Sequence, residues 1–448
     1  MEARCMIFRA YDVRGTYPEE VNEEVALKIG KAFGTYNTGK IVVGTDTRLS
    51  SPALKEALIR GLISTGAEVT DIGVVTTPMV IFATVHLKQD GGVMVTASHN
   101  PKEYNGFKFN DGRGIPISYE SGIREIQKIY NVGYFSVGEG KLNSIDIIED
   151  YAKFLLERIK VRAEGLKVVV DAGNGSAGLI YPKVLRELGA SVYELNCEPD
   201  GNFPNRDPDP ANRASLLQLQ RKVVEVGADI GFAYDVDGDR LAVVDEKGSI
   251  MEPKKVFALL VDITLGKKPA TKVVHDILTS MAIEERIRKR GGIPIPSKVG
   301  HTYIAQKLLE EGAALAGELS GHYYFEETFG ADDALFASLR LIEYLVATRT
   351  QLSEYGVDIP SYFAEDMRVP IRESEKFNYV EKLRRRFQGE GYRVDCMDGV
   401  KVFFDDGWLV VRPSHTEPKI SVAYEAVDKW HFEYIKRLVR EILDERPR

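Results

Sequence analysis

One pattern occurs three times in the sequence: KIVVGTDTRLSSPALKEALIRGLISTGAEVTDIG (residues 40–73), KVVVDAGNGSAGLIYPKVLRELGASVYELN (167–196) and KVVHDILTSMAIEERIRKRGGIPIP (272–296). Each copy runs from a β-branched segment through a polar or glycine-rich turn into an amphipathic helix, a glycine and a second strand-like segment. Strand, helix and strand in this order require right-handed crossovers and favour a mostly parallel sheet. The repeat predicts three similar α/β domains with mixed, mostly parallel sheets, and one large α/β sheet is the alternative.

The first copy also predicts where its helix begins and ends. Ser51 is the expected N-cap, with Pro52 at the first helical position. Gly66 is expected to stop the helix before the next strand.

The pattern changes after about residue 362 to a helix flanked by strands and hairpins. Asp-Gly pairs at 398–399 and 406–407 are turn signals, and a final helix is expected through residues 434–443. A chain of 448 residues exceeds the size that one hydrophobic core supports, so several domains are expected. The predicted α/β domains and the smaller C-terminal α+β domain span 1–150, 151–252, 253–362 and 363–448.

Composition narrows the classes of function. Hydrophobic residues make up 44% and charged residues 28%, as in ordinary soluble globular proteins. The net charge of -8 argues against a nucleic-acid or anionic-membrane binder, since those need a basic face. Cys5, Cys197 and Cys396 are too far apart for a Cys-x-x-Cys pair. An odd number of cysteines suits no simple disulfide framework, and no uncharged apolar run reaches the ~18 residues of a membrane span. We therefore expect a cytoplasmic protein whose partner is neither nucleic acid nor membrane and whose oligomeric state is unknown.

The segment Asp235-Val236-Asp237-Gly238-Asp239-Arg240 is the strongest candidate for a metal site. Three carboxylates in five residues repel each other unless a cation neutralises them, and oxygen ligands suit Mg²⁺ or Ca²⁺. An EF-hand loop fails because Arg240 stands where glycine is required, and because residues 229–232 and 241–244 resemble strands. A solvated acidic hairpin turn is the remaining alternative.

Ser98 lies in the segment TASHNP (96–101), just past the apolar run 92–95. Ligands bind at such strand ends in α/β sheets. A serine is a weak nucleophile unless neighbours activate it or it already carries a transferable group, and His99 and Lys108 offer nearby polar assistance. The alternative is a plain Asn-Pro turn.

Two further loops carry groups suited to a phosphorylated sugar. The segment GELSGH (317–322) combines a carboxylate, a hydroxyl and an imidazole, which suit sugar hydroxyls. The segment RPSHTEP (412–418) follows a predicted strand and offers an Arg fork, two hydroxyls and backbone N–H groups for a phosphate. A buried hydrogen-bonded turn and a plain surface loop are the respective alternatives.

These four loops, in this order, together resemble the α-D-phosphohexomutase superfamily, and its phosphomannomutase/phosphoglucomutase branch in particular. The resemblance covers nearly the whole chain. The opening FRAYDVRG (8–15) resembles that branch and differs from the FGTDGIRG style of phosphoglucosamine mutases. The resemblance implies a heart-shaped, four-domain architecture around a central cleft. It also implies a mutase that interconverts hexose 6-phosphate and hexose 1-phosphate, with mannose and glucose phosphates as expected substrates and phosphoglucosamine mutase as the alternative.

The resemblance assigns roles to three groups of residues. Phosphoserine and Mg²⁺ would occupy a site formed by Ser98, Asp235, Asp237 and Asp239. The substrate would be bound by Tyr11, Glu318, Ser320, Arg412, Ser414, His415 and Thr416. The residues that would stabilise charge or transfer protons are Arg14, Lys108, Arg240, His301 and His322. Either Lys108 or His322 would be the general base. A hexose 1,6-bisphosphate would be the intermediate and activator.

Two departures from the family pattern and two rival functions remain. His415 stands where Asn or Gly is usual, which would add a pH dependence to phosphate binding. Leu278 stands where many relatives carry a substrate-contacting lysine, so that contact must be lost or supplied elsewhere. The rivals are a phosphatase with Asp235 as nucleophile and a non-catalytic phosphosugar-binding protein.

Overall fold

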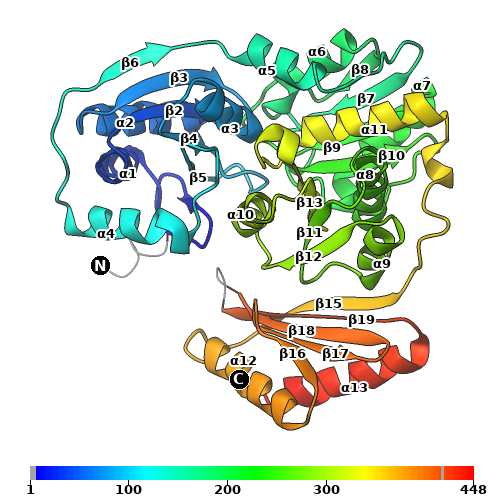
Figure 1. Cartoon of the computed structure of the whole chain (residues 1–448). Coiled ribbons are helices and arrows are strands. Elements are labelled where there is room, and N and C mark those ends of the chain that lie inside the picture. The colour runs from blue at the N-terminus through cyan, green and yellow to red at the C-terminus, as the bar shows by residue number, and fades with distance from the viewer. Residues whose placement is uncertain (1–6, 415–417, 448) are drawn as a thin grey trace.

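The computed structural model describes residues 7–414 and 418–447, which form four sheets with their own helices (Figure 1). The first sheet has the strand order β1 (Val13–Thr16), β5 (Tyr104–Asp111), β4 (Gly91–Val95), β2 (Lys40–Thr45), β3 (Glu68–Val74), β6 (Lys141–Ser144). The second has the order β10 (Leu241–Asp245), β9 (Ile230–Tyr234), β7 (Lys167–Asp171), β8 (Ser191–Leu195). The third has the order β14 (Tyr323–Phe325), β13 (Leu315–Gly317), β11 (Lys272–Asp276), β12 (Ile293–Ser297). We refer to each sheet with its helices as a unit.

The first three units share one plan. A central strand, β2, β7 or β11, pairs in parallel with a strand on each side. A fourth strand, β5, β10 or β14, then pairs antiparallel. The single-sheet alternative is excluded, and the three similar α/β domains predicted from the repeat are confirmed.

Helices connect and cover these sheets. The first unit has α1 (Glu23–Tyr36), α2 (Ser51–Ile63), α3 (Thr77–His86) and α4 (Arg124–Val132). The second has α5 (Ile148–Leu156), α6 (Ala177–Glu187) and α7 (Leu217–Val226). The third has α8 (Pro253–Lys267), α9 (Met281–Lys289), α10 (His301–Glu311) and α11 (Ala334–Thr348).

The start of α2 differs by one residue from the expectation. Ser50 is the N-cap, and Ser51 is the first helical residue, followed by Pro52. The physical reason is that Ser51 Oγ donates to Asp46 Oδ1 at 2.6 Å, so its hydroxyl is committed to the preceding loop. The helix ends at Ile63, three residues before Gly66.

One hydrophobic core joins the first three units. Alternate residues of each central strand face opposite layers, as in β2, where Val42 faces the shared core while Ile41 and Val43 face a core local to the first unit. Helices α3, α5, α6, α8, α9 and α11 contribute to the shared core. The opposite face of each sheet is covered by α1, α2 and α4 in the first unit, by α7 in the second and by α10 in the third. The first three units therefore pack directly against one another.

The fourth unit is an antiparallel sheet below the others in Figure 1. Its strand order is β15 (Phe363–Pro370), β19 (Lys419–Ala426), β18 (Gly407–Pro413), β17 (Val400–Phe404), β16 (Arg393–Asp395). Helices α12 (Lys376–Gly389) and α13 (Lys429–Asp444) pack on one face. Trp408 and Val410 point from the other face to Ile277 of the third unit. The predicted α+β domain is confirmed.

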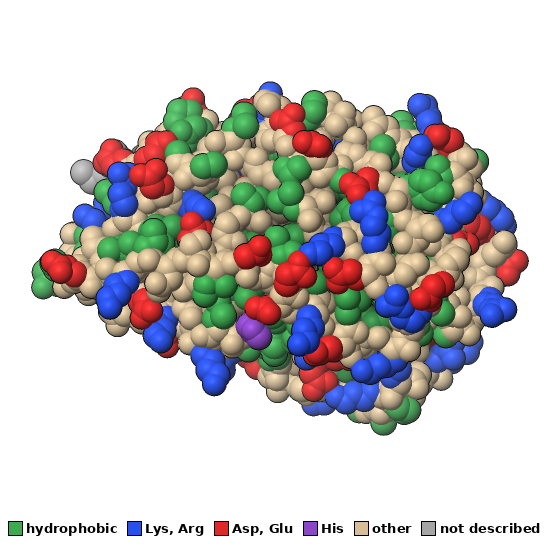
Figure 2. All heavy atoms as spheres, turned by 90° about the horizontal axis from the view of Figure 1, so that it is seen from above, with side chains coloured by type: hydrophobic (Ala, Val, Ile, Leu, Met, Phe, Trp, Pro, Cys, Tyr) green, Lys and Arg blue, Asp and Glu red, His purple; other side chains and the backbone are tan. Residues whose placement is uncertain are grey.

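One face of the molecule carries charges of both signs. Figure 2 shows acidic and basic side chains interspersed there. Among the described residues, no helix combines the length and apolar character needed to cross a bilayer.

Candidate functional site

The predicted loops occupy equivalent places in the repeated plan. Ser98 lies between β4 and β5, the acidic loop between β9 and β10, and the 318–322 loop between β13 and β14. Each is therefore the turn that leads into the antiparallel fourth strand of its unit. Arg412 lies near the end of β18, before the turn into β19. The repetition thus presents three equivalent turns, and the contacts below show that they meet.

Ser98 is held in an uncommon backbone conformation. Its φ is 48°, in the left-handed region that a non-glycine residue adopts at a cost. Its N–H donates to Thr96 Oγ1 at 2.8 Å, and its carbonyl accepts from Arg48 Nη2 at 2.6 Å. These contacts fix the turn, and backbone strain of this kind is concentrated at functional sites.

Arg48 holds the Ser98 turn in place, a contact that sequence reasoning missed. Its guanidinium is buried, pairs with Asp46, and donates to the carbonyls of Ser98, Asn100, Pro101 and Tyr104. The signal was the polar turn TDTR after the first strand of the repeat. The carbonyl groups that accept hydrogen bonds from Arg48 lie about 50 residues further along the chain, so the sequence alone did not show this contact.

Ser98 contacts the acidic loop of the second unit. Its Oγ donates to Asp235 Oδ2 at 2.8 Å, while Asp235 Oδ1 accepts from the N–H groups of Asp239 and Arg240, each at 3.1 Å. Burial, reinforced by Asp239 and Asp237, raises the pKa of Asp235 well above its ordinary value. A buried carboxylate thus contacts Ser98, and a cation at this loop would stabilise its charged form.

The residues present fit Mg²⁺. Asp235, Asp237 and Asp239 each offer an oxygen, these oxygens lie within 4.8 Å of one another, and all three residues are buried. Within the described part of the chain, Asp237 Oδ1 and Asp239 Oδ1 have no hydrogen-bond partner. An all-oxygen donor set suits Mg²⁺. Strands flank the loop, so an EF-hand is excluded.

Lys108 partly neutralises this loop. Its Nζ lies 2.7 Å from Asp237 Oδ2 and 2.6 Å from Asp239 Oδ2. Burial alone would lower the pKa of Lys108, but the two carboxylates raise it above its ordinary value. In this arrangement Lys108 is a cation, and Thr77 Oγ1 also donates to Asp237 Oδ2 at 2.6 Å.

Two arginines border the same turn. Arg14 Nη1 donates to Asn100 Oδ1 at 2.6 Å, and Arg240 Nε lies 3.9 Å from Asp235 Oδ2. The buried Nε atoms of both arginines have no hydrogen-bond partner among the described residues. Burial, and then the charges of Arg240 and Arg14, lower the pKa of His99, so that imidazole is neutral. The site is thus rich in fixed positive charge suited to a phosphoryl group.

The third unit supplies the predicted imidazoles and hydroxyl. His322 Nδ1 lies 2.9 Å from Ser320 Oγ, and its Nε2 lies 3.4 Å from Asp239 Oδ1. The His301 ring stacks 6.2 Å from the His322 ring. Burial, and then Lys108, lower the pKa of His301 well below its ordinary value. Glu318 accepts from the hydroxyl of Tyr324. These groups therefore lie beside the acidic loop.

The fourth unit reaches the site through a chain of contacts. Arg412 Nε lies 3.0 Å from Asp398 Oδ2, which also accepts from the N–H of Val299 at 3.1 Å. The carbonyl of Val299 accepts from the Tyr11 hydroxyl at 2.9 Å. Burial raises the pKa of Tyr11 to about 12, although Arg412 opposes the shift. Tyr11 and Arg412, from opposite ends of the chain, thus meet at one loop.

Four other residues singled out in the sequence belong to the fourth unit or to its contact with the third. Ser414 lies at the turn after β18, and its N–H donates to the carbonyl of Lys419 at 2.9 Å. His415 and Thr416 lie outside the described residues. Leu278 packs against the cluster that contains Trp408, so its side chain contributes to the contact between the third and fourth units.

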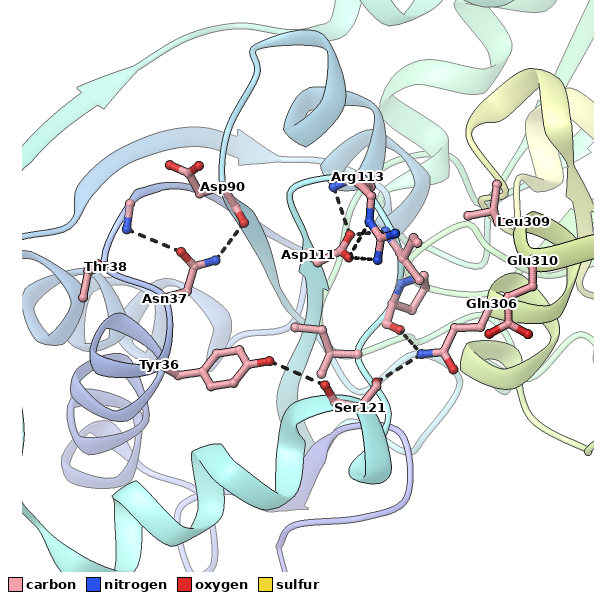
Figure 3. Close-up of a pocket in the computed structure, with 14 residues that line it drawn as sticks. Tyr36, Asn37, Thr38, Asp90, Asp111, Arg113, Ser121, Gln306, Leu309 and Glu310 are labelled. Atoms are coloured by element: carbon pink, nitrogen blue, oxygen red, sulfur yellow. Dashed lines mark hydrogen bonds and ion pairs between the residues drawn. The ribbon is translucent and has the colours of Figure 1, made fainter. Parts of the chain in front are cut away.

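One large cavity lies away from these turns. It has a volume of about 950 Å³ and lies between the first and third units. Figure 3 shows Gln306 of α10 reaching toward Ser121, with Nε2 3.0 Å from Ser121 Oγ. None of the predicted site residues lines this cavity. The convergence of polar groups, and not cavity volume, therefore locates the candidate active site.

Comparisons with known proteins agree with this organisation. Models of phosphoglucomutase/phosphomannomutase alpha/beta/alpha domains I, II and III match residues 5–136, 149–248 and 252–362, and the model of the C-terminal domain matches 367–442. A phosphomannomutase/phosphoglucomutase from Pseudomonas aeruginosa is 38% identical over 98% of this chain and 95% of its own length. A phosphoglucomutase/phosphomannomutase from Thermococcus kodakarensis is 37% identical over 94% of both chains.

A solved structure gives the same result. The crystal structure of a phosphoglucomutase/phosphomannomutase family protein from Burkholderia thailandensis matches with a TM-score of 0.89 and 33% identity, covering 98% of this chain and 97% of that one. The family predicted from the four loops is therefore confirmed. This chain is a member of the phosphoglucomutase/phosphomannomutase family.

Proposed function

We propose that this chain is a phosphohexomutase that moves phosphate between C6 and C1 of a hexose through Ser98. The observation that carries the proposal is the 2.8 Å contact between Ser98 Oγ and Asp235 Oδ2, made from a strained turn. Arg14, Lys108 and Arg240 surround this contact with positive charge. A phosphoryl group passing in line between Ser98 and a sugar hydroxyl needs that stabilisation, because its transfer is promoted chiefly by positioning and electrostatics.

The acidic loop would hold Mg²⁺. The proposed ligands are Asp235, Asp237, Asp239 and an oxygen of phosphorylated Ser98. When bound, the cation would offset charge on the transferred phosphoryl group. Lys108 would stay close to Asp237 and Asp239 and add a second positive charge.

The sugar hydroxyl must lose a proton as it attacks. Lys108 and His322, which both lie against Asp239, are the candidate bases. His322 is favoured, because Asp237 and Asp239 outweigh burial, raise the pKa of Lys108 and hold it protonated. Ser320 contacts the other ring nitrogen of His322 and so orients the imidazole. His301 beside it would remain neutral, supplying a donor or acceptor without adding charge.

The substrate would lie between the 318–322 loop and the fourth unit. Glu318 and Ser320 would bind sugar hydroxyls, and Arg412, Ser414, His415 and Thr416 would bind the phosphate that is not being transferred. A phosphate loop of this kind recognises phosphate and not a particular carbon. It can therefore hold either end of a hexose 1,6-bisphosphate as that intermediate turns over.

Mannose and glucose phosphates are the proposed substrates. Relatives at 38% and 37% identity are named for both activities, which supports this choice. The two hexoses differ only at C2, so Glu318 and Ser320 can bind hydroxyls that both share. The functional division that we propose places the phosphoserine, metal, sugar and phosphate domains at 1–150, 151–252, 253–362 and 363–448.

Parallel coupled assays test the proposal. After priming with glucose 1,6-bisphosphate, we expect turnover of mannose and glucose phosphates, poor turnover of glucosamine phosphate, and almost none in Ser98→Ala. Ser144→Ala, on the exposed edge strand β6, is the matched control and should keep full activity. Higher efficiency with glucosamine 6-phosphate would overturn the branch assignment. Tight sugar-phosphate binding without isomerisation would favour the non-catalytic alternative.

A further inference from the structure

Asp332, just before α11, has no role in the proposed reaction, but it completes a cluster with Asp239 and His322, which have roles in it. His322 Nε2 lies 3.4 Å from Asp239 Oδ1 and 3.9 Å from Asp332 Oδ2. The ligand atoms of all three residues lie within 4.8 Å of one another, and all three residues are buried. The cluster joins the turns before β10 and β14 to the start of α11.

The two carboxylate oxygens that face His322 have no hydrogen-bond partner. Asp239 Oδ1 and Asp332 Oδ2 are buried, and within the described residues neither has a hydrogen bond at normal distance, although His322 Nε2 faces both. The exposed fraction of Asp332 is 2%, so its carboxylate lies away from bulk solvent. A buried oxygen without a partner is costly, and two that converge on one imidazole indicate a missing positive ligand.

The imidazole is oriented for metal binding. Ser320 Oγ lies 2.9 Å from His322 Nδ1 and can accept a hydrogen bond from an Nδ1–H group. The Nε2 lone pair then points toward Asp239 and Asp332. Metal-binding histidines almost always donate a hydrogen bond from the second ring nitrogen, usually to a carboxylate, a backbone carbonyl or water, and Ser320 Oγ would be the acceptor here.

The spacing and chemistry distinguish this cluster from the Mg²⁺ site. Zn²⁺ binds imidazole nitrogen and carboxylate oxygen at about 2.0–2.2 Å, so tetrahedral ligands lie about 3.3–3.6 Å apart. The observed separations of 3.4 and 3.9 Å require only a small adjustment. Imidazole suits Zn²⁺, whereas an all-oxygen loop suits Mg²⁺.

We propose that Asp239, His322 and Asp332 form a second divalent-metal site of the Zn²⁺ class. Lys108 bonds to Asp239 Oδ2 and leaves Oδ1 open. Because Asp239 Oδ1 is also an open oxygen of the acidic loop, the two sites compete for it. Zn²⁺ would also block His322 Nε2. It would therefore inhibit the mutase, a consequence that rests on the proposed function, whereas binding itself does not.

The test is calorimetric titration of the metal-free full chain with ZnCl₂ and, in separate runs, with MgCl₂, because saturating Mg²⁺ would itself occupy Asp239. Asp332→Asn keeps the shape and removes one ligand of the second site, while Asp235→Asn is the matched control in the acidic loop. We expect Zn²⁺ affinity to fall at least about tenfold in Asp332→Asn and in His322→Gln. It should change little in Asp235→Asn, and Mg²⁺ affinity should show the reverse order.

Two outcomes would overturn the proposal. Equal Zn²⁺ affinity in wild type, Asp332→Asn and His322→Gln would show that these residues are not ligands. A larger loss in Asp235→Asn would place Zn²⁺ in the acidic loop. Circular dichroism establishes that each variant is folded. If only one of the Asp332 and His322 variants folds, that variant is sufficient for the test. Because Zn²⁺ binding is measured directly, absence of mutase activity would contradict the proposed function but not the proposed metal site.

Discussion

Replacement of Lys108 by Met should destabilise the metal-free protein. Lys108 Nζ lies 2.7 and 2.6 Å from Asp237 and Asp239, and the exposed fraction of both carboxylate side chains is 0%. Removing one partner of a buried ion pair costs about 3–5 kcal/mol, because the remaining charge is uncompensated. We expect a loss of this order in the presence of EDTA.

Mg²⁺ should restore much of this loss. A cation at 100 times its Kd stabilises the folded protein by about 2.7 kcal/mol. Without Lys108 the loop is more negative, so Mg²⁺ should bind more tightly and raise the melting temperature more in Lys108→Met than in wild type. Thermal melting in EDTA and in MgCl₂ measures this difference.

Lys401→Met is the matched control. Lys401 is also buried, but its Nζ donates to the carbonyl of Ile277 at 2.7 Å, in the contact between the third and fourth units. Its Mg²⁺-induced shift should equal that of wild type. An equal shift in Lys108→Met and wild type would refute the proposed link between Lys108 and the metal loop.

Three further predictions test the site and its support. Asp237→Asn removes a charge while keeping the shape, so Mg²⁺ affinity and turnover should fall together, and full activity of the chelator-treated variant would contradict the metal assignment. Arg48→Lys should lower the melting temperature and the rate of Ser98 phosphorylation, because an ammonium group cannot reproduce the planar fork that bridges several carbonyls, and unchanged values would contradict its positioning role. Burial, and then Glu318, raise the pKa of Asp276 to about 7, so its contribution to stability is present at acidic pH and is lost as the pH rises from about 4 through 7. Asp276→Asn should therefore gain up to about 4 kcal/mol relative to wild type between pH 4 and pH 8 in denaturant titrations, and a parallel pH profile would contradict the shift.

Much of the fold follows from local pattern. Buried β-branched strands, turns and amphipathic helices recur in the sequence, and the structure repeats the same four-strand plan three times. The Asp406-Gly407 pair joins β17 to β18 as expected. The start of α2 was displaced because Asp46 binds Ser51, a contact that helix propensity does not encode.

The site was only partly visible in the sequence. Carboxylates at alternate positions and a serine after a strand are local signals, so the acidic loop and Ser98 were found. Arg48 and Asp332 were missed because their roles depend on partners far along the chain. Arg48 binds carbonyls of another loop, and Asp332 is significant only beside His322 of the neighbouring turn.

The position of phosphate on the active protein is the most direct test of the proposed reaction. The protein is incubated with glucose 1,6-bisphosphate, and intact-mass analysis is followed by peptide mapping. We predict partial phosphorylation that maps to Ser98, is lost in Ser98→Ala and is retained in Ser144→Ala. Phosphate found reproducibly on Asp235, with none on Ser98, would contradict the phosphoserine mechanism and favour an aspartate-nucleophile phosphatase.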